Sequence, residues 1–588
     1  KESVVRIKMK YKLLAASILA TLSTSAMSAT YKLEELGGLE GSKHNYITDV
    51  SENGHIIGLA NGTYKLPVDV SYIDFDASNI KNAYDREKAR FESINKEITF
   101  TLDDIQNNDA VNTNADAHAF MIWFLSTDSR PNDSEYQKIS SAIATTYTAE
   151  GSQEQVLFDE ASLDYDGLTR STSNLLSAVA DDGVMVGWGS APYEKTAFTQ
   201  TDETEEETHF LRDFISRGIV IGANGVEVPL VPEFDEHGGI SAAYDIVKTN
   251  SGYEVVGTVS TGIPVDPQDD IDDRCDNEDE PVSDCVETLN RSFSTGIFDK
   301  RAVKWTLDND LNIINTEIFG LGLTPKDDED FAFRSSAFVI NENGVIAGTS
   351  DVRYKDRDIR ITMPVIFENG EVKEFLDQED DWTSGQPLAI NNDDVVVGYA
   401  TKRIEGTNRT KFFYYDKKSD SVVFPTDYFS SSSSIANDIN DNGVIVGEGE
   451  TDIYNTSTRR REGFMYTIGE DKVVNLNDLL PCYEEDGETR FKYVVAEAKS
   501  INNNNEIFGV ATKTVEKTDS FGNTVVDLNG NVEYESIAVP VKLTPISGSI
   551  EECPAEEVEQ YERQSASFPW YALILLPFAA ARRFFKAK

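Results

Sequence analysis

The chain has 588 residues and a formal net charge of −50, from 53 Lys and Arg against 103 Asp and Glu. This balance argues against nucleic acid as a partner, because binding phosphate groups requires a basic face, and it disfavours adhesion of the folded part to an anionic membrane surface. Hydrophobic residues make up 39% and aromatic residues 10% of the chain, which is enough for a packed core.

The first predicted element is an export signal within residues 1–29. The residues before Met9 form an upstream extension, and Lys10 and Lys12 then precede the short apolar run 13–22. This is the pattern of a bacterial signal peptide. The small residues after which cleavage is expected are Ala26, Ser28 and Ala29. The alternative, an N-terminal membrane anchor, is not favoured by so short an apolar run.

One sequence phrase recurs seven times between residues 30 and 545. It consists of Ile-Asn or a variant, two or three polar residues, Gly, a short aliphatic run and a closing Gly, as in 340–348 and 439–447. Asn-Gly and Asp-Gly favour tight turns between antiparallel strands, and the aliphatic run predicts a buried strand. The closing Gly suits a bulge or a close backbone approach. The glycines assigned to turns and closing positions are Gly54, Gly58, Gly183, Gly187, Gly252, Gly257, Gly344, Gly348, Gly398, Gly443, Gly447 and Gly509.

A second strand pattern, rich in aromatic or aliphatic residues, follows each copy of the phrase. The seven stretches are 120–123, 210–215, 303–305, 365–367, 412–414, 464–466 and 539–541. Each unit therefore holds about four short strands, and the closest copies are about 50 residues apart, the length of one propeller blade. The sequence predicts an all-β fold over residues 30–545, a seven-bladed β-propeller with long loop insertions. Ring closure predicts that 31–36 pairs with 536–543, since unpaired sheet edges are prone to aggregation.

These repeats resemble the HAF repeats of bacterial extracellular proteins, and residues 31–39 are similar to the usual opening of that repeat. Taken with its two ends, the chain resembles an exported gammaproteobacterial family of unknown function. The resemblance implies the propeller and supplies no catalytic residue.

Four insertions lengthen the predicted blades. They are 68–117, with a short helix expected near 80–96, and 128–170, 263–295 and 514–535. Long insertions on propellers commonly gather on one face and build the binding surface.

The insertion 263–295 is extremely acidic and contains two of the four cysteines. An even number of cysteines in an exported chain favours disulfides. Three pairings are open, and we favour Cys275–Cys285, which closes a short loop, with Cys482–Cys553. The carboxylates considered as calcium ligands are Asp269, Asp270, Asp272, Asp273, Asp276 and Asp279. The alternative is a solvated charge run, which the lack of EF-hand spacing favours. No other cofactor is predicted.

A polar spacer, 546–567, leads to a hydrophobic C-terminal tail, 568–588. Its apolar part, 568–581, would span about 21 Å as a helix, short of a hydrocarbon core of about 30 Å. The basic end, Arg582, Arg583, Lys586 and Lys588, is expected to stay cytoplasmic. The arrangement resembles GlyGly-CTERM and PEP-CTERM sorting tails, which a dedicated protease often removes, although Ser565-Ala566-Ser567 stands where a Gly-Gly pair is usual. The alternative is a buried C-terminal helix.

Enzyme motifs are absent from the sequence. There is no GxSxG, HExxH or P-loop, and Ser93-Ile94-Asn95-Lys96 lacks the partner motifs of a serine-lysine enzyme. The five histidines, His44, His55, His118, His209 and His237, show no metal-ligand spacing. No catalytic or cofactor-binding residue is therefore predicted.

The leading prediction is a non-catalytic exported propeller that binds a ligand or protein, such as an envelope protein or glycan, in the periplasm, at the cell surface or outside the cell. Its tail would contact the membrane. The alternatives are a carboxylate-dependent hydrolase or lyase acting on polysaccharide or peptide at the propeller axis, and an envelope scaffold. A deep axial pocket lined by converging carboxylates plus His or Arg favours the enzyme, whereas a shallow or plugged face favours binding.

Overall fold

The computed structural model describes residues 30–548, apart from 149–150, 166, 202–203, 205, 276–278, 454–458, 482, 486–487 and 491–492. The expected signal peptide and apolar tail, and nearly all of the polar spacer, lie outside the described residues. Among the residues that are described, no helix is both long and apolar enough to cross a membrane.

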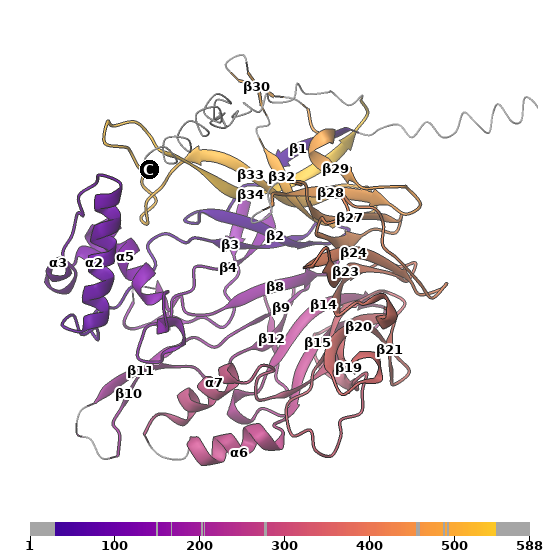
Figure 1. Ribbon diagram of the computed structural model, residues 1–588, viewed down its shortest axis with the longest axis horizontal. Coiled ribbons are helices and arrows are strands. Elements are labelled where there is room, and N and C mark those ends of the chain that lie inside the picture. The colour runs from indigo at the N-terminus through magenta and orange to yellow at the C-terminus, as the bar shows by residue number, and fades with distance from the viewer. Residues whose placement is uncertain are drawn as a thin grey trace, which may run out of the picture. The chain divides into compact units, whose positions relative to one another are not determined.

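Seven four-stranded antiparallel sheets form the blades of a β-propeller, which confirms the predicted fold class (Figure 1). From the inner to the outer strand, blades 1 to 3 are β2 (His44–Val50), β3 (Ile56–Asn61), β4 (Ile143–Thr148), β5 (Gly151–Glu154); β8 (Asn174–Val179), β9 (Met185–Gly189), β12 (Arg217–Ile221), β13 (Glu227–Leu230); and β14 (Ser241–Thr249), β15 (Gly252–Gly262), β16 (Asp299–Asp308), β17 (Ile313–Ile318).

Blades 4 to 7 follow in chain order. They are β18 (Ser335–Ile340), β19 (Ile346–Arg353), β20 (Arg360–Glu368), β21 (Glu371–Glu374); β22 (Ser384–Ile390), β23 (Val395–Ile404), β24 (Thr407–Asp416), β25 (Ser421–Val423); β26 (Ser434–Ile439), β27 (Val444–Glu450), β28 (Arg461–Thr467), β29 (Val474–Asn475); and β32 (Val494–Ile501), β33 (Ile507–Glu516), β34 (Tyr534–Ile546), β1 (Thr30–Glu35).

The seven inner strands contact one another in a closed ring. Each touches the inner strand of the next blade, and β32 of the last blade touches β2 of the first. Apolar side chains fill the space between blades. Phe412 of blade 5, for example, lies 4.9 Å from Phe464 of blade 6, centroid to centroid, and both are buried. The core is therefore a series of layers between sheets, arranged around the axis.

The N-terminal strand completes the last blade. Strand β1 pairs with β34 in the register Tyr31–Pro545, Leu33–Leu543 and Glu35–Val541, so the predicted closure is confirmed. Tyr31 is 2% exposed in this position. The outer edge of blade 7 is thus covered by residues from the opposite end of the chain.

Between β3 and β4 the chain forms a small helical layer with its own apolar core. Its helices are α2 (Ser78–Ser93), α3 (Leu102–Asn107), α4 (Ala110–Thr113) and α5 (Ala115–Leu125). The helix expected near 80–96 corresponds to α2. The expectation of a strand at 120–123 is wrong, because Asn114 caps α5 through bonds from the Asp116 and Ala117 N–H groups and the apolar run packs helix against helix. The third strand of blade 1 is β4.

Residues 128–170 are only partly an insertion, since they contain β4 and β5. They also hold the 3₁₀ turn η1 (Arg130–Asn132) and the short hairpin β6 (Ala161–Ser162) and β7 (Gly167–Leu168). In blade 2 the predicted third strand is also misplaced. Phe210 and Leu211 belong to a separate hairpin, β10 (Glu194–Phe198) with β11 (Glu207–Leu211), and β12 takes the blade position instead.

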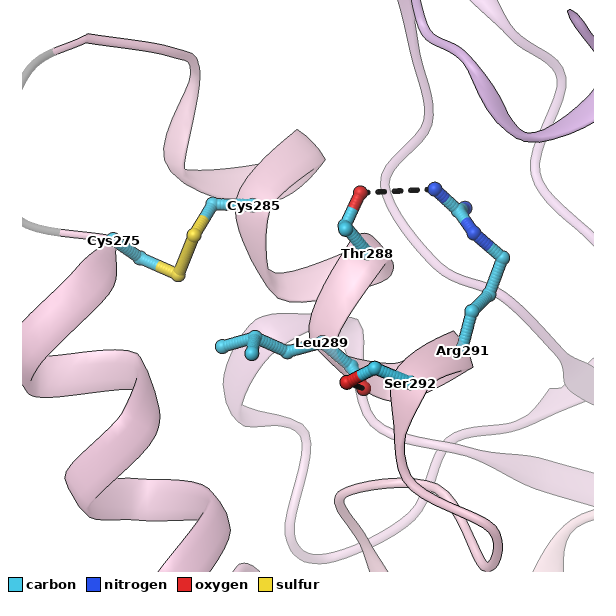
Figure 2. The surroundings of a disulfide bond; sticks show 6 residues. All are labelled: Cys275, Cys285, Thr288, Leu289, Arg291 and Ser292. Atoms are coloured by element: carbon cyan, nitrogen blue, oxygen red, sulfur yellow. Dashed lines mark hydrogen bonds between the residues drawn. A yellow bond between two sulfur atoms is a disulfide. The ribbon is translucent and has the colours of Figure 1, made fainter. Parts of the chain in front are cut away.

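The acidic insertion is a helical hairpin rather than a loop. Helices α6 (Val265–Arg274) and α7 (Val282–Ser292) are joined by a disulfide between Cys275 and Cys285, with an S–S length of 2.01 Å (Figure 2). In Figure 1 this pair lies apart from α2, α3 and α5. The pairing is the one favoured from the sequence, whereas Cys482 and Cys553 lie outside the described residues.

The remaining elements are short. They are η2 (Glu236–Gly238), η3 (Tyr354–Asp356), η4 (Gln378–Asp380), η5 (Leu476–Leu479), and the hairpin β30 (Tyr483–Glu485) with β31 (Glu488–Arg490). The hairpin belongs to a second unit, separate from the propeller.

Candidate functional site

Each inner strand carries an extra residue at the same place, and β32 carries a second one at Ala496. In blade 6, Ala436 pairs with Gly447 and Asp438 pairs with Val446, which leaves Asn437 as a β-bulge. The seven bulge residues are Thr48, Ser177, Tyr244, Phe338, Leu388, Asn437 and Lys499. The repeat therefore presents one bulge side chain per blade at the same level of the ring.

The closing glycine of each repeat packs against this bulge. A Cβ atom at Gly447 would lie 2.0 Å from the carbonyl oxygen of Ile435, and one at Gly348 would lie 1.9 Å from that of Ser336. All seven closing glycines approach a carbonyl in this way: Gly58, Gly187, Gly257, Gly348, Gly398, Gly447 and Gly509. The glycine is needed because the bulged strand brings its backbone too close for any side chain.

The asparagines of the turns link neighbouring blades. Asn440 Oδ1 accepts the N–H of Val444 at 3.0 Å, which caps its own turn, while its Nδ2 donates to the carbonyl of Asn502 in blade 7 at 3.0 Å. Asn391 reaches Asn440 in the same way, and Asn341 reaches Asn391. The amide oxygen of each of these asparagines therefore stabilises its own turn, and the amide nitrogen binds the next blade.

The bulge residues and their neighbours enclose a cavity of about 370 Å³. All seven inner strands contribute to its wall, which places it on the propeller axis. Three consecutive blades supply the apolar bulge residues Tyr244, Phe338 and Leu388. The other four supply the polar bulge residues Asn437, Lys499, Thr48 and Ser177. The wall of the cavity is therefore apolar on one side and polar on the other.

Three aspartates follow a bulge and line this cavity. Asp49 Oδ2 accepts the N–H of Val179 at 2.9 Å, and Asp245 Oδ2 accepts that of Ile340 at 2.8 Å. In each case the donor belongs to the next blade. Asp438 has the same arrangement, as described next.

Asp438 shows the arrangement most fully. Its Oδ2 accepts the N–H of Ile501 and the hydroxyl of Ser500, both at 2.8 Å, and its Oδ1 accepts the N–H of Ile439 at 2.8 Å. Each axial aspartate also accepts an N–H from its own strand. These carboxyl groups therefore fasten adjacent inner strands where the bulge interrupts regular pairing.

The axial carboxyl groups are deep in the protein, although each keeps part of its surface on the cavity. Burial raises the pKa of Asp49 to about 6, that of Asp245 to about 8 and that of Asp438 to about 7. The charge of Asp49 adds to the rise for both of the others, and Asp438 adds to the rise for Asp245. Hydrogen bonds from the backbone oppose the rise and do not cancel it.

A larger cavity, of about 600 Å³, lies between α7 and the β10–β11 hairpin with its flanking loops. Its main charged pair is already complete, because Arg212 binds Glu287 through two hydrogen bonds, of 3.0 and 2.6 Å. Glu287 also accepts from Tyr193 and Arg291. This network joins the insertions to one another, and we take the axial cavity as the candidate site because the repeat places one residue from every blade on it.

Ser134, His209 and Asp284 meet between the insertions, and these are the residue types of a catalytic triad. Ser134 Oγ lies 2.9 Å from His209 Nδ1 and donates to Asp284, and Asp284 Oδ2 lies 3.5 Å from the same Nδ1. A triad requires the serine and the acid on opposite ring nitrogens. Because both groups meet Nδ1, this cluster is not a triad.

The candidate calcium ligands are not gathered at one point. Asp269, Asp270, Asp272 and Asp273 lie along α6, Asp279 precedes α7, and Asp276 lies outside the described residues. Within the described part of the chain, no three His, Cys, Asp or Glu side chains are arranged to hold a metal ion. Calcium binding stays a prediction.

The axial residues were not identified from the sequence, although a mark of them is present. In two of the seven copies an Asp stands directly before the aliphatic residue that precedes the turn, in Asp49-Val50 and Asp438-Ile439. A carboxylate at a buried strand position without a nearby basic residue is unusual. That position, compared across the copies, would have marked Asp49 and Asp438, whereas Asp245 lies further from the turn of its longer hairpin.

Solved propeller structures resemble this fold only distantly. The β-propeller domain of the Trilobed protease from Pyrococcus furiosus gives a TM-score of 0.31 at 9% identity, over 67% of this chain and 87% of that one. An oligogalacturonate lyase from Vibrio parahaemolyticus gives 0.31 at 10%, over 68% and 83%. TolB from Acinetobacter baumannii gives 0.27 at 10%, over 58% and 63%.

These scores are too low to support any argument about activity. Among curated proteins, none matches the sequence significantly. A family model described as "Protein of unknown function (DUF3466)" matches residues 8–584, and the chain belongs to that family.

Proposed function

We propose that this protein is an exported, non-catalytic propeller that binds a small ligand in its axial cavity. The proposal is carried by one observation: each axial aspartate accepts backbone N–H groups from two strands, as in Asp245 and Asp438. A carboxylate-dependent hydrolase or lyase needs carboxyl groups free to exchange protons with a substrate. Groups that fasten two blades together are fixed in position, which suits the binding of a ligand better than proton transfer to a reacting substrate.

The cavity has the character of a binding site. Its volume, about 370 Å³, lies within the range of small-molecule sites, which are commonly lined by apolar side chains with a few placed polar groups. Tyr244, Phe338 and Leu388 supply the apolar wall. The polar wall would then fix the orientation of the ligand.

Filling the cavity tests this proposal. Amino acids, sugars, sugar acids and amines are screened by thermal shift against three proteins. These are the wild type, Leu388→Trp, in which the new side chain fills the cavity, and the control Ile314→Trp. Ile314 lies on an outer strand and is 61% exposed. We expect at least one compound to raise the Tm of the wild type and of the control but not of Leu388→Trp. Equal shifts in all three proteins, or none in any, would contradict the proposal.

A hydrolase or lyase acting on polysaccharide or peptide is the second candidate, and the raised pKa values of Asp245 and Asp438 favour it. The cavity places Lys499, rather than a His or Arg, beside these carboxyl groups. The test is turnover of polyuronates and peptides by the wild type. Loss of at least about 100-fold in Asp438→Asn with an unchanged melting curve would establish the enzyme.

The location of the protein is proposed from the two ends of the sequence. We propose that residues up to 29 direct export and that 568–588 place the protein in the envelope, with or without removal by a sorting protease. The resemblance of the repeats to HAF repeats, and of the chain to an exported gammaproteobacterial family, supports this proposal. Mass spectrometry of cell fractions tests this. Intact 568–588 in a membrane fraction means an anchored protein, and loss of that segment with release means a sorted one. Full-length, unprocessed chain in the cytoplasm would contradict export.

We separately propose that the insertion 263–295 binds calcium. Carboxylates are the oxygen ligands that calcium prefers, and the disulfide holds the two helices of the insertion together. Isothermal titration of the propeller with Ca²⁺ decides it. Absence of both heat and thermal stabilisation would remove the idea.

A further inference from the structure

The charges on the axial cavity wall are unequal. Its carboxyl groups are Asp49, Glu52, Asp181, Asp245, Glu342 and Asp438. Within the described part of the chain, none of the six lies within 4 Å of a lysine or arginine nitrogen. The wall therefore carries more negative charge than the protein's own cations balance.

The two lysines on the wall already have partners elsewhere. Lys248 Nζ lies 2.5 Å from Asp182 Oδ2, and Lys499 Nζ lies 3.7 Å from Glu497 Oε1. Neither Asp182 nor Glu497 lines the cavity. Lys499 also lies near enough for its charge to lower the pKa of Asp49. The two lysines on the wall therefore offset its six carboxyl groups only in part, which leaves room for another cation.

Burial is the main reason that the inner carboxyl groups Asp49, Asp245 and Asp438 hold protons. The charge of Asp49 adds to the rise in the pKa of Asp245 and of Asp438. In a poorly solvated cavity such a cluster is stabilised either by protons or by a cation from solution. A cation that enters would therefore displace protons.

The opposite wall favours a cation that has an apolar body. Tyr244 and Phe338 lie 4.8 Å apart, centroid to centroid, and Leu388 continues the same wall. Aromatic faces attract cations and also bury apolar groups. A bare metal ion is less suited, because the described residues hold no three acidic, His or Cys side chains arranged for one.

We infer that the axial cavity binds an organic cation: a protonated amine carried on an aromatic or aliphatic body. The inference rests on the proposed ligand-binding function and names the class of ligand. The ammonium group takes the place of a proton among the axial carboxyls, and the body packs against Tyr244, Phe338 and Leu388. The carboxylates nearer the turns, Glu52, Asp181 and Glu342, attract the cation into the cavity.

Three probes of matched size test the class of ligand. Phenethylamine, 2-phenylethanol and 3-phenylpropionate are titrated calorimetrically into the full propeller at pH 7 and fixed ionic strength. We expect only the amine to bind. Because its charge lowers the pKa of the axial carboxyls, binding should release up to about one proton, seen as a difference in heat between phosphate and Tris buffers.

Variants place the binding in the cavity. Asp245→Asn should weaken amine binding at least tenfold, and Leu388→Trp should abolish it. Asp269→Asn, an exposed change on α6, should leave it unchanged. If Asp245→Asn fails to fold, proton release by the wild type remains the decisive measurement.

The outcomes separate the inference from the function on which it rests. Binding of the alcohol or the acid, abolished by Leu388→Trp, would keep ligand binding at the axis and overturn the cation. Binding of the amine without proton release, or unaffected by Leu388→Trp, would also overturn it. If no amine binds while other compounds stabilise the wild type, only the inference fails. If nothing in either panel binds, both fail.

Discussion

Two opposing effects meet at each axial aspartate. Backbone N–H groups hydrogen-bond both oxygens of Asp245 and favour its ionised form, while burial favours the neutral acid. Burial is the larger effect, since the pKa rises to about 8. The neutral acid also avoids repulsion from Asp49 and Asp438. These side chains therefore contribute to the fold in a form that depends on pH.

The first prediction concerns the pH dependence of stability. The folded protein keeps Asp245 protonated up to about pH 8, whereas the unfolded chain ionises it near pH 4. Between these values the folded state binds the extra proton, so the free energy of unfolding falls as pH rises, by about 1.4 kcal/mol per pH unit for this group. Urea titrations from pH 4.5 to 8 measure the slope.

Asp245→Asn should flatten that slope by about the same amount, whereas Asp269→Asn should not change it. Stability that rises with pH equally in the wild type and in Asp245→Asn would show that the axial carboxyl is ionised throughout the range. The comparison of slopes holds even if the variant is less stable at every pH.

The turn asparagines carry a second prediction at the residue scale. Asn440 is 3% exposed, accepts the N–H of Val444 and donates to the carbonyl of Asn502 in the next blade. Asn440→Ala leaves buried backbone groups without partners and should cost about 2–4 kcal/mol of unfolding free energy. Asn504→Ala, in an exposed turn position, should cost less than about 0.5 kcal/mol. Equal losses in the two variants would mean that neither bond of the Asn440 side chain stabilises the fold.

At the scale of the element, the bulge and the closing glycine form one device. The bulge turns a side chain toward the axis, and the glycine on the neighbouring strand makes room for the displaced carbonyl. Neither works without the other, which explains why the repeat keeps both at a constant spacing. The same device in seven blades produces the ring of side chains around the cavity.

Replacing a closing glycine should therefore be costly. A Cβ at Gly447 would lie 2.0 Å from the carbonyl oxygen of Ile435, so Gly447→Ala must displace a buried strand, at a cost of about 2–4 kcal/mol. Gly320→Ala is the matched control, because nothing lies within 4 Å of its Cβ position. Denaturant titration of the two variants measures the difference. A loss below about 1 kcal/mol for Gly447→Ala would show that the bulge yields without strain.

The first two strands of every blade were predictable because their determinants are local. Turn residues and closing glycines act within about twelve residues of chain, and the copies could be compared with one another. The third strands of blades 1 and 2 were not predictable in this way. The run around Phe120 is apolar and short, and periodicity alone does not separate a buried strand from a helix. The true strand β4, in which four of six residues are threonine or alanine, is less apolar than the helix that was taken for it.

The axial site could not be predicted from the sequence, for a different reason. Its members come from seven separate segments, and only closure of the ring brings Asp49, Asp245 and Asp438 to one cavity. Their roles also depend on donors in other blades, such as the N–H of Ile340. A repeat reveals equivalent positions, but which of those positions meet at the axis follows from the number of blades and the curvature of the inner strands.

At the scale of the whole molecule, one short strand joins the two ends of the propeller. Strand β1 covers the edge of β34 and buries Tyr31. A protein that begins at Gly41, compared with one that begins at Thr30, should lose this cover and aggregate through the exposed edge. Its Tm should fall by about 5–10 °C, at about 2–4 °C per kcal/mol, with larger species in light scattering. An unchanged monomer of equal Tm would mean that the closure is dispensable.

The closure by β1 also sets an order of events in folding. Glu35 pairs with Val541, so the last blade is assembled from residues that are synthesised before and after the other six blades. Contacts between such distant residues form slowly, because the entropy of closing the intervening chain must be overcome first. Until then blades 1 and 6 each lack the packing against blade 7 that covers one of their sheet faces in the closed ring. The incomplete propeller can therefore bind a chaperone or mispair with another chain until its C-terminal blade has been synthesised.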